Sequence, residues 1–292
     1  MGIEGELVTP LTIPAAQPID GEYAEMFFRQ CLRGEAAAMG RDINVVAIAR
    51  NACPHLHNTL RCIDALRVRF RRLRLYVFEN DSSDETAAVL DEYASRNIMD
   101  TVVEHDSLGR PDYRGWEEDR TKFLAEYRNR CLQHVCDYEE WVLAPWTVVL
   151  DMDPHGGFLP NGVMNSIGWL EDPGYSYAGG MASYSIIRTT DEEGRVWTAH
   201  YDAYAARPVS WWRDRRNEIG MSWFQSMLMP IGAYPQPMNS AFGGLCVYRT
   251  EALIAGRYSG GDCEHVNLHR MMAAEGWKMF LNPGSVYAAI LG

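Results

Sequence analysis

Two carboxylates stand one residue apart at the end of an apolar run, in the stretch VVLDMDPHGGF (148–158). Alternate side chains of an extended backbone point the same way, so Asp151 and Asp153 would share a side. Two carboxylates at one place repel unless a cation or hydrogen-bond donors compensate them. Mg²⁺ or Mn²⁺, bound through carboxylate oxygens and substrate phosphates, meets that need. The pair predicts a divalent-metal site, although a single Asp at a strand end is commonly a turn former or helix cap.

A second acidic stretch, FENDSSDET (78–86), follows another apolar run. Ser82 and Glu85 have the spacing of a capping box, which predicts the start of a helix. Glu79 is not explained by that cap, and a carboxylate there suits hydrogen bonds to a ribose or a base edge. A cap alone, and a cap combined with a ligand contact, both fit this stretch.

Arg128 and a pair of glycines have two interpretations each. Arg128, in the helical stretch YRNRCL (127–132), is placed to offset the charge of a diphosphate or to lie on a solvated helix face. Gly243 and Gly244, in AFGGLC (241–246), either relieve crowding where a strand begins or let the backbone approach a sugar closely.

The stretch GGDCEHVNLH (260–269) predicts the start of another helix. With Asp262 as N-cap, Glu264 falls in the first turn, where the helix dipole favours an ionised carboxylate. That position suits a catalytic base or a charge stabiliser. His265 and His269 are four residues apart and share a helix face, a spacing that can hold a metal. For His269 a place at the rim of the core is favoured.

Alternating apolar runs and amphipathic patterns supply the elements that must position these residues. Strands are expected at 43–51, 73–80, 100–106 and 146–153, with helices at 56–70, 82–96 and 123–135 between them. This order is typical of a doubly wound, mostly parallel α/β sheet with helices on both faces. Ligands bind such sheets at the carboxyl ends of the strands, where the acidic residues above and Arg50 fall.

The remainder of the chain predicts a long hairpin, 175–190 with 195–207, around a turn at DEEG (191–194). A strand at 241–249, a helix at 261–276 and a strand at 277–284 follow. We expect residues 1–42 to form an N-terminal arm with a peripheral helix, whose face carries Met26, Phe27, Cys31 and Leu32, and residues 43–292 to form one domain.

Composition excludes several classes of function. A formal charge of -12 disfavours a nucleic-acid or anionic-membrane binder, because both need a basic surface. Seven Cys without a CxxC pair indicate reduced thiols. The N-terminus lacks the basic start of a signal peptide, and WVLAPWTVVL is too short for the roughly 20 residues that span a bilayer. We expect a soluble, cytoplasmic protein without an integral membrane segment. Peripheral membrane association and a removed membrane anchor are both compatible with the sequence.

Over roughly residues 43–284 the chain resembles the GT-A glycosyltransferases. The matching stretches, in order, are NVVAIARN, VFENDSSDET, YRNRCL, VVLDMD, FGGLCVYR and DCEHVNLHRMMAAEGWKMFLNP. Within that superfamily, ARN, ENDSSDET and CEH are most similar to the capsule-associated mannosyltransferase group and related polysaccharide enzymes. The resemblance implies a Rossmann-like sheet, with residues 43–153 binding a nucleotide sugar and 154–292 binding an acceptor.

The resemblance also implies the roles of individual residues. Asp153, assisted by Asp151, would hold Mn²⁺ or Mg²⁺ on the diphosphate of a UDP- or GDP-linked sugar, with His265 as a further metal ligand. The donor would also contact Arg50, Glu79, Asp81, Arg128, Gly243 and Gly244. Glu264 would stand near the acceptor hydroxyl of a glycan or other glycoconjugate that receives a hexose. The family motif has Asp after this residue, where this chain has His265, so inversion and retention both stay open.

Other interpretations compete with the transferase. A metal-dependent hydrolase would use His265 and His269 and hold zinc tightly. A sugar- or nucleotide-binding module would keep the fold without turnover. A nucleotidyltransferase needs a Gly-rich, basic phosphate loop after the first strand, which ARNACPHLHN (49–58) lacks. Tyr201, Asp202, Trp211 and Trp212 are further acceptor-side candidates, against the alternative that large aromatic residues are simply core.

Overall fold

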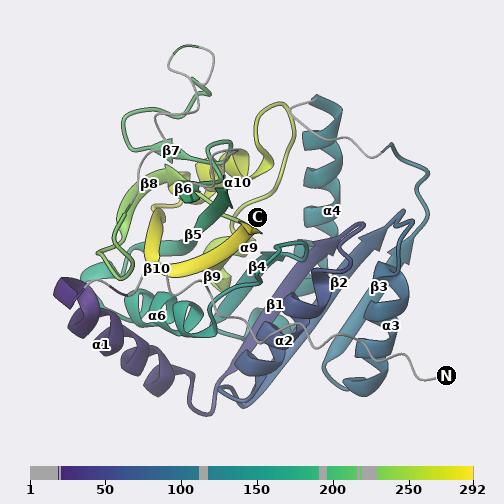
Figure 1. Cartoon of the computed structure of the whole chain (residues 1–292), viewed down its shortest axis with the longest axis horizontal. Helices are drawn as coiled ribbons and strands as arrows, with labels where there is room; N and C mark the ends of the chain where they lie inside the picture. Colours follow the sequence, from purple (N-terminus) through teal and green to yellow (C-terminus); the bar gives the residue numbers. More distant parts are fainter. Residues whose placement is uncertain are drawn as a thin grey trace.

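A mixed sheet of ten strands forms the centre of the described part of the chain (Figure 1). The computed structural model describes residues 19, 21–111, 118–190, 196–215, 218 and 229–291. The strand order is β3-β2-β1-β4-β9-β5-β10-β8-β7, and β6 pairs with β5. The strands are β1 Asp42–Ala49, β2 Arg72–Asn80, β3 Thr101–Asp106, β4 Trp146–Asp151, β5 Ala178–Thr190, β6 Val196–His200, β7 Arg207–Pro208, β8 Gln236–Ser240, β9 Leu245–Arg249 and β10 Lys278–Leu291.

The first four strands are parallel, as predicted. β1 pairs with β2 on one side and β4 on the other, and β3 adds to β2. The register sets Ala49 beside Glu79 and Ile48 beside Asp151, so three carboxyl ends meet at one edge of the sheet. The sequence-based positions of these strands are confirmed to within a few residues.

The remaining strands make the other half of the same sheet. β9 runs antiparallel between β4 and β5, while β10 is parallel to β5. The predicted hairpin is confirmed, because β5 and β6 pair antiparallel from Ile186 with His200 to Thr190 with Val196. Its turn at 191–194, and most of the tryptophan-rich stretch 211–225, lie outside the described residues.

Helices cover both faces of the sheet, which confirms the predicted α/β class. On one face lie α2 Leu56–Arg67, α3 Thr86–Arg96 and α6 Pro160–Leu170; on the other lie α4 Glu118–Asp137, α9 Thr250–Ile254 and α10 Glu264–Ala274. Alternation along β1 explains this: Val45 and Ala47 belong to the first core cluster and Val46 to the second. Strands buried on both faces read as continuous apolar runs. The short elements α5 Glu139–Val142 and η1 Pro173–Tyr175 connect the larger ones.

The predicted peripheral helix is α1, Gly21–Ala38, but its buried face differs from the predicted one. Phe27 and Cys31 are buried, whereas Leu32 is 70% exposed. The reason is α6, a helix that the sequence analysis did not identify. A Cβ on Gly34 would lie 1.9 Å from the carbonyl oxygen of Met164, so α1 and α6 touch through their backbones. This close approach turns the glycine face of α1 inward in place of Leu32.

The predicted capping box of α3 does not form. The helix begins at Thr86 with Glu85 at the N-cap, and Glu85 makes no side-chain cap. Asp84 Oδ1 instead accepts from the amide of Thr86, and Ser82 Oγ accepts from the amide of Asn51 at the end of β1. The polar loop after β2 is therefore fastened to the loop after β1.

Candidate functional site

A cavity of about 490 Å³ opens at the carboxyl ends of the parallel strands. Its volume falls in the range of pockets for small molecules and cofactors. It is lined by Ile48, Ala49, Arg50, Asn51, Ala52, Asn80, Pro111, Arg120, Phe123, Leu124, Tyr127, Arg128, Asp151, Met152, Asp153 and Tyr201. Of the predicted site residues, the structure brings Arg50, Arg128, Asp151, Asp153 and Tyr201 onto its wall.

Asp151 and Asp153 both face this cavity. The amide of Asp151 donates to the carbonyl of Gly244 at 2.8 Å, which joins the end of β4 to the start of β9. Asp153 is exposed to the cavity, yet its pKa is raised, first by desolvation from the surrounding protein and then by the negative charge of Asp151. The positive charges of Arg120 and Arg128 offset part of that rise. The carboxylate of Asp151 is therefore close enough to disfavour ionisation of Asp153.

Arg128 is the buried cation of the site. It is 4% exposed, and its Nη2 donates to Asp151 Oδ1 at 2.8 Å while its Nε donates to Glu264 Oε1 at 3.0 Å. The guanidinium also lies over the ring of Phe242 at 4.8 Å. A buried charge needs such partners, because desolvation is costly without them. The positive charge of Arg128, which the sequence analysis assigned to a diphosphate, is therefore already paired with two carboxylates.

Glu264 lies in the first turn of α10, as expected, but with a different cap. Cys263 is the N-cap, and Asp262 instead accepts from Arg207 Nη2 at 2.7 Å. Glu264 is 3% exposed and is not among the described residues that line the cavity. Glu264 accepts a hydrogen bond from Arg128, and Arg128 lines the cavity.

The two histidines of α10 lie in the core. His269 is bonded at both ring nitrogens, by Ser240 Oγ at 2.8 Å and Tyr248 Oη at 2.9 Å, and burial lowers its pKa to about 3. His265 stacks on Phe242 with ring centroids 3.7 Å apart. Burial and then the charge of Arg128 lower the His265 pKa far below its usual value, which makes the ring neutral. His269 is structural, and the arrangement gives no support to a zinc hydrolase built on this pair.

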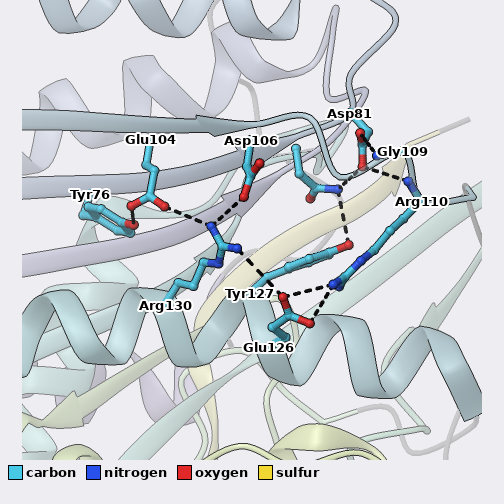
Figure 2. A network of polar contacts seen from close by, with 10 residues as sticks. Tyr76, Asp81, Glu104, Asp106, Gly109, Arg110, Glu126, Tyr127 and Arg130 are labelled. Carbon is cyan, nitrogen blue, oxygen red and sulfur yellow. Dashed lines mark hydrogen bonds and ion pairs between the residues drawn. The ribbon is translucent and has the colours of Figure 1, made fainter.

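The loop after β3, residues 107–111, contributes Pro111 to the cavity wall, and two predicted donor-binding residues hold this loop in place. Asp81, at φ +53°, accepts from the amides of Gly109 at 2.8 Å and Arg110 at 3.3 Å (Figure 2). Arg50 donates to the carbonyls of Arg110 at 2.8 Å and Pro111 at 3.1 Å. Arg110 is in turn held by both carboxylate oxygens of Glu126 on α4, which Figure 2 shows. Asp81 thus holds the loop that reaches the cavity wall. Arg50 holds the same loop and also lines the cavity.

Glu79 does not lie on the cavity wall among the described residues. It is 4% exposed, its Oε1 accepts from the amide of Ser82 at 3.0 Å, and its Oε2 pairs with His105 Nδ1 at 2.8 Å. The other nitrogen of His105 pairs with Asp91 Oδ1 at 2.8 Å. Each oxygen of Glu79 thus has a partner within the protein, and Glu79 holds the loop after β2.

Gly243 and Gly244 are required by packing. Both have positive φ, +69° and +81°. A Cβ would lie 2.0 Å from the carbonyl oxygen of Ser183 at Gly243, and 2.3 Å from the ring of Tyr287 at Gly244. Relief of crowding, the first of the two interpretations, accounts for both glycines.

Asp202 is a fourth carboxylate near the site. Its Oδ1 accepts from the amide of Ala205 at 3.0 Å and its Oδ2 from the amide of Gly243 at 2.8 Å. Its pKa is raised by desolvation and, more weakly, by the charges of Asp151 and Glu264. The preceding residue, Tyr201, lines the cavity and is 48% exposed. Asp202 is therefore the neighbour in sequence of an exposed residue on the cavity wall.

The other acceptor-side candidates and one unpredicted residue complete the site. Trp211 lies under the guanidinium of Arg215 and Trp212 under that of Arg270, and neither is among the described residues lining the cavity. Arg120, which the sequence analysis assigned no role, does line it. Polar residues precede α4, so the start of this helix was not recognisable from the sequence. The helical spacing between Arg120 and the pair Tyr127 and Arg128 was the signal that could have placed Arg120 on the cavity wall.

The residues present fit a divalent ion that is completed by its substrate. Within the described ranges, no three His, Cys, Asp or Glu side chains form a metal-binding group, so His265 is not brought to Asp151 and Asp153. Mg²⁺ and ions like it are usually bound through one or two carboxylates together with substrate phosphates. Two cavity-facing carboxylates, one with a pKa raised by desolvation and by its neighbour, match that donor set.

No protein-family model and no curated protein matches the chain. Among solved structures, it is similar to the mannosyltransferase PcManGT from Pyrobaculum calidifontis in complex with GDP-Man and Mn²⁺, with 16% identity, a TM-score of 0.47, and coverage of 91% of this chain and 67% of that one. It is also similar to GalNAc-T7 with UDP, GalNAc and Mn²⁺, with 12% identity, a TM-score of 0.48, and coverage of 86% of this chain but 44% of that one.

A third similar structure is the glucosyl-3-phosphoglycerate synthase from Mycobacterium tuberculosis with Mn²⁺, UDP-Glc and phosphoglyceric acid. Identity is 16%, the TM-score is 0.47, and coverage is 89% of this chain and 75% of that one. The chain thus spans less than half of GalNAc-T7. All three TM-scores are below 0.5. None of the described helices has the length and apolar character needed to cross a membrane.

Proposed function

We propose that the chain is a metal-dependent glycosyltransferase that moves a hexose-type sugar from a UDP- or GDP-linked donor to a hydroxyl acceptor, a glycan or other glycoconjugate. The observation that carries this proposal is the pair Asp151 and Asp153 on the wall of a cavity at the carboxyl ends of parallel strands. Ligands of such sheets bind at that edge. The GT-A motifs in the sequence support the same assignment.

The charge balance of the site supports a cationic cofactor. Four carboxylates, those of Asp151, Asp153, Asp202 and Glu264, stand against the guanidinium groups of the three cavity arginines, Arg50, Arg120 and Arg128, a formal excess of one negative charge. The pKa values of Asp153 and Asp202 are raised first by desolvation and, to a smaller extent, by the charges of neighbouring carboxylates. A divalent ion on Asp151 and Asp153 would offset the excess negative charge, and when bound would stabilise charge on a departing diphosphate.

The residues of the chain have distinct tasks in this proposal. Asp153 would bind the metal through its exposed carboxylate. Asp151 would supply a second carboxylate ligand, oriented by its hydrogen bond from Arg128. Arg50, Asn51 and the loop 107–111 bound the part of the cavity that would take the nucleoside.

Transfer by inversion also needs a base that takes the acceptor proton. Glu264 remains our candidate for that step. Its hydrogen bond from Arg128 joins it to the same guanidinium that orients Asp151, which would link the acceptor and donor sides. Asp202 is the alternative carboxylate if Glu264 only positions Arg128.

Binding of nucleotide sugars tests the proposal directly. Thermal unfolding of the whole chain is measured with UDP- and GDP-linked hexoses, each with and without Mn²⁺. Stabilisation should require both partners, because a ligand that binds only the folded state raises the unfolding temperature. Mn²⁺ alone or nucleotide alone should act weakly. No shift with any donor and metal would remove the proposal, and tight zinc binding would replace it with a hydrolase.

A further inference from the structure

Three arginines line the cavity, and they differ in what already occupies their donors. Arg50 donates to two backbone carbonyls, and Arg128 donates to two carboxylates. For Arg120, no hydrogen bond or ion pair connects it to another residue in the described ranges. Arg120 is therefore the cavity cation whose donors no described residue uses, whereas Arg128 keeps only Nη1 and Arg50 only Nε without a hydrogen-bond partner there.

The position of Arg120 fixes where its charge acts. It is the third residue of α4, a 20-residue helix, and its side chain is half-buried. Residues three to four positions apart share a helix face, and Phe123, Leu124 and Tyr127 of the same helix also line the cavity. The charge of Arg120 is felt at Asp153 and at Tyr201. Arg120 thus stands in the cavity within electrostatic reach of the carboxylate that would hold the metal.

The dipole of α4 adds a partial positive charge at this end of the helix, although its first two residues, Glu118 and Asp119, are acidic. Helix N-termini carry a partial positive charge, and that of a long helix favours an anion nearby. Here the helix begins at Glu118, two residues before Arg120. An anion between Arg120 and a metal on Asp153 would be held from both sides, whereas the charge of Arg128 is already shared by two carboxylates and only its Nη1 has no partner among the described residues.

We propose that Arg120 binds the diphosphate of the donor and stabilises it as the leaving group, and that Arg128 instead orients Asp151 and Glu264. This inference rests on the proposed glycosyltransferase function. In the transfer step the bond from the anomeric carbon to the diphosphate oxygen breaks and its electron pair stays on that oxygen. The acceptor oxygen forms the new bond and its proton passes to the base carboxylate. Arg120 meets the negative charge that develops on the diphosphate, in the way that fixed cations stabilise transferring phosphates.

The test separates the diphosphate from the nucleoside. Binding of UDP, GDP, uridine, guanosine and inorganic pyrophosphate is measured by calorimetry in the presence of Mn²⁺, for the whole chain and for Arg120→Ala. A charge-assisted contact is worth a factor of roughly ten or more in affinity. Arg120→Ala should lose that factor for UDP or GDP and for pyrophosphate, and change nucleoside binding by less than about two-fold.

Two further variants control the experiment. Arg120→Lys keeps the charge but not the planar fork, so it should recover part of the lost affinity. Arg130→Ala removes an arginine of the same helix that is bonded to Glu104 and Asp106 (Figure 2), and it should bind every ligand as the parent does. Arg120→Gln replaces the Ala variant if that variant unfolds, and the same losses are expected of it.

The outcomes keep the two proposals apart. If the parent chain binds neither UDP nor GDP, the glycosyltransferase function fails whatever Arg120 does. If the parent binds them and Arg120→Ala binds them equally well, the role of Arg120 is wrong while the function stands. Equal losses for nucleoside and nucleoside diphosphate would also overturn it, because they would mean a general change in the cavity.

Discussion

Arg128 and Asp151 are joined by a hydrogen bond of 2.8 Å between Nη2 and Oδ1, in which the guanidinium is almost completely buried. The same guanidinium bonds Glu264 through Nε at 3.0 Å. One side chain of α4 therefore links the end of β4 to the first turn of α10. Residues 151 and 264, far apart in sequence, are fixed relative to each other by this contact.

Removing that guanidinium should destabilise the fold. Arg128→Ala leaves Asp151 and Glu264 without their buried counter-charge, and breaking a buried ion pair from one side costs about 3–5 kcal/mol. The free energy of unfolding is measured by urea denaturation. Arg130→Ala, on the same helix but in a partly exposed network, should cost less than about 1 kcal/mol. Similar losses in both variants would contradict the assigned role of Arg128.

Loss of Asp153 should abolish metal-dependent nucleotide binding. Asp153→Ala removes the exposed cavity carboxylate without touching the core, so its unfolding temperature without ligand should stay close to that of the parent. Calorimetry with a nucleotide sugar should show that added Mn²⁺ no longer increases affinity. Glu251→Ala, at an exposed position of α9, is the control and should bind as the parent does. Unchanged Mn²⁺-dependent binding in Asp153→Ala would remove the metal role.

Neutralising Glu264 should separate binding from transfer. Glu264→Gln preserves the shape of the side chain and a contact to Arg128, so donor affinity should change little. Loss of a general base lowers turnover by about 10²–10⁴-fold, which a product assay would detect. Full transfer activity in this variant would mean that another carboxylate takes the proton, and Asp202→Asn would then be the variant to examine.

A methyl group at Gly244 should be much more harmful than one at a glycine of similar backbone conformation in open space. Its Cβ would meet the ring of Tyr287 at 2.3 Å, and the hydroxyl of Tyr287 donates to the carbonyl of Asp151. Gly40 also has positive φ, +72°, but a Cβ there meets nothing within 4 Å. Gly40→Ala should cost about 1 kcal/mol from backbone strain alone, and Gly244→Ala about 1–3 kcal/mol more from overpacking. Equal losses of unfolding free energy would show that Tyr287 moves aside freely.

The contribution of His105 to stability should depend on pH. Desolvation alone would lower its pKa, but the hydrogen bonds and charges of Glu79 and Asp91 outweigh it and raise the pKa above the usual 6.5. Only the doubly protonated ring donates to both carboxylates. A raised folded-state pKa adds stability that is complete below pH about 6.5 and is lost as pH rises through the folded value.

The comparison of parent and His105→Asn measures this contribution. The difference in unfolding free energy should be larger at pH 6 than at pH 9. His57→Asn, at an exposed position of α2, should show no comparable dependence. A difference for His105→Asn that is the same at both pH values would mean that the ring acts only by packing.

Much of the fold follows from local patterns in the sequence. The apolar run at 43–49 and the alternating helices predicted β1 to β4 because a strand buried on both faces needs continuous apolar residues. α6 was not identified, and Leu32 was assigned to the wrong face of α1, because both depend on a glycine contact between α1 and α6. A contact between segments about 130 residues apart leaves no local pattern in either segment.

By itself the sequence determined the residue types of the site and the strand ends that carry them: Asp151, Asp153 and Arg50 belong to strands whose carboxyl ends must meet. Only the tertiary structure decided which polar groups stay available to a ligand. It turned Glu79 and Asp81 into supports of neighbouring loops, tied Arg128 to two carboxylates and left Arg120 facing the cavity. The physical reason is that a buried polar group must find a partner, and the identity of that partner depends on residues remote in the chain.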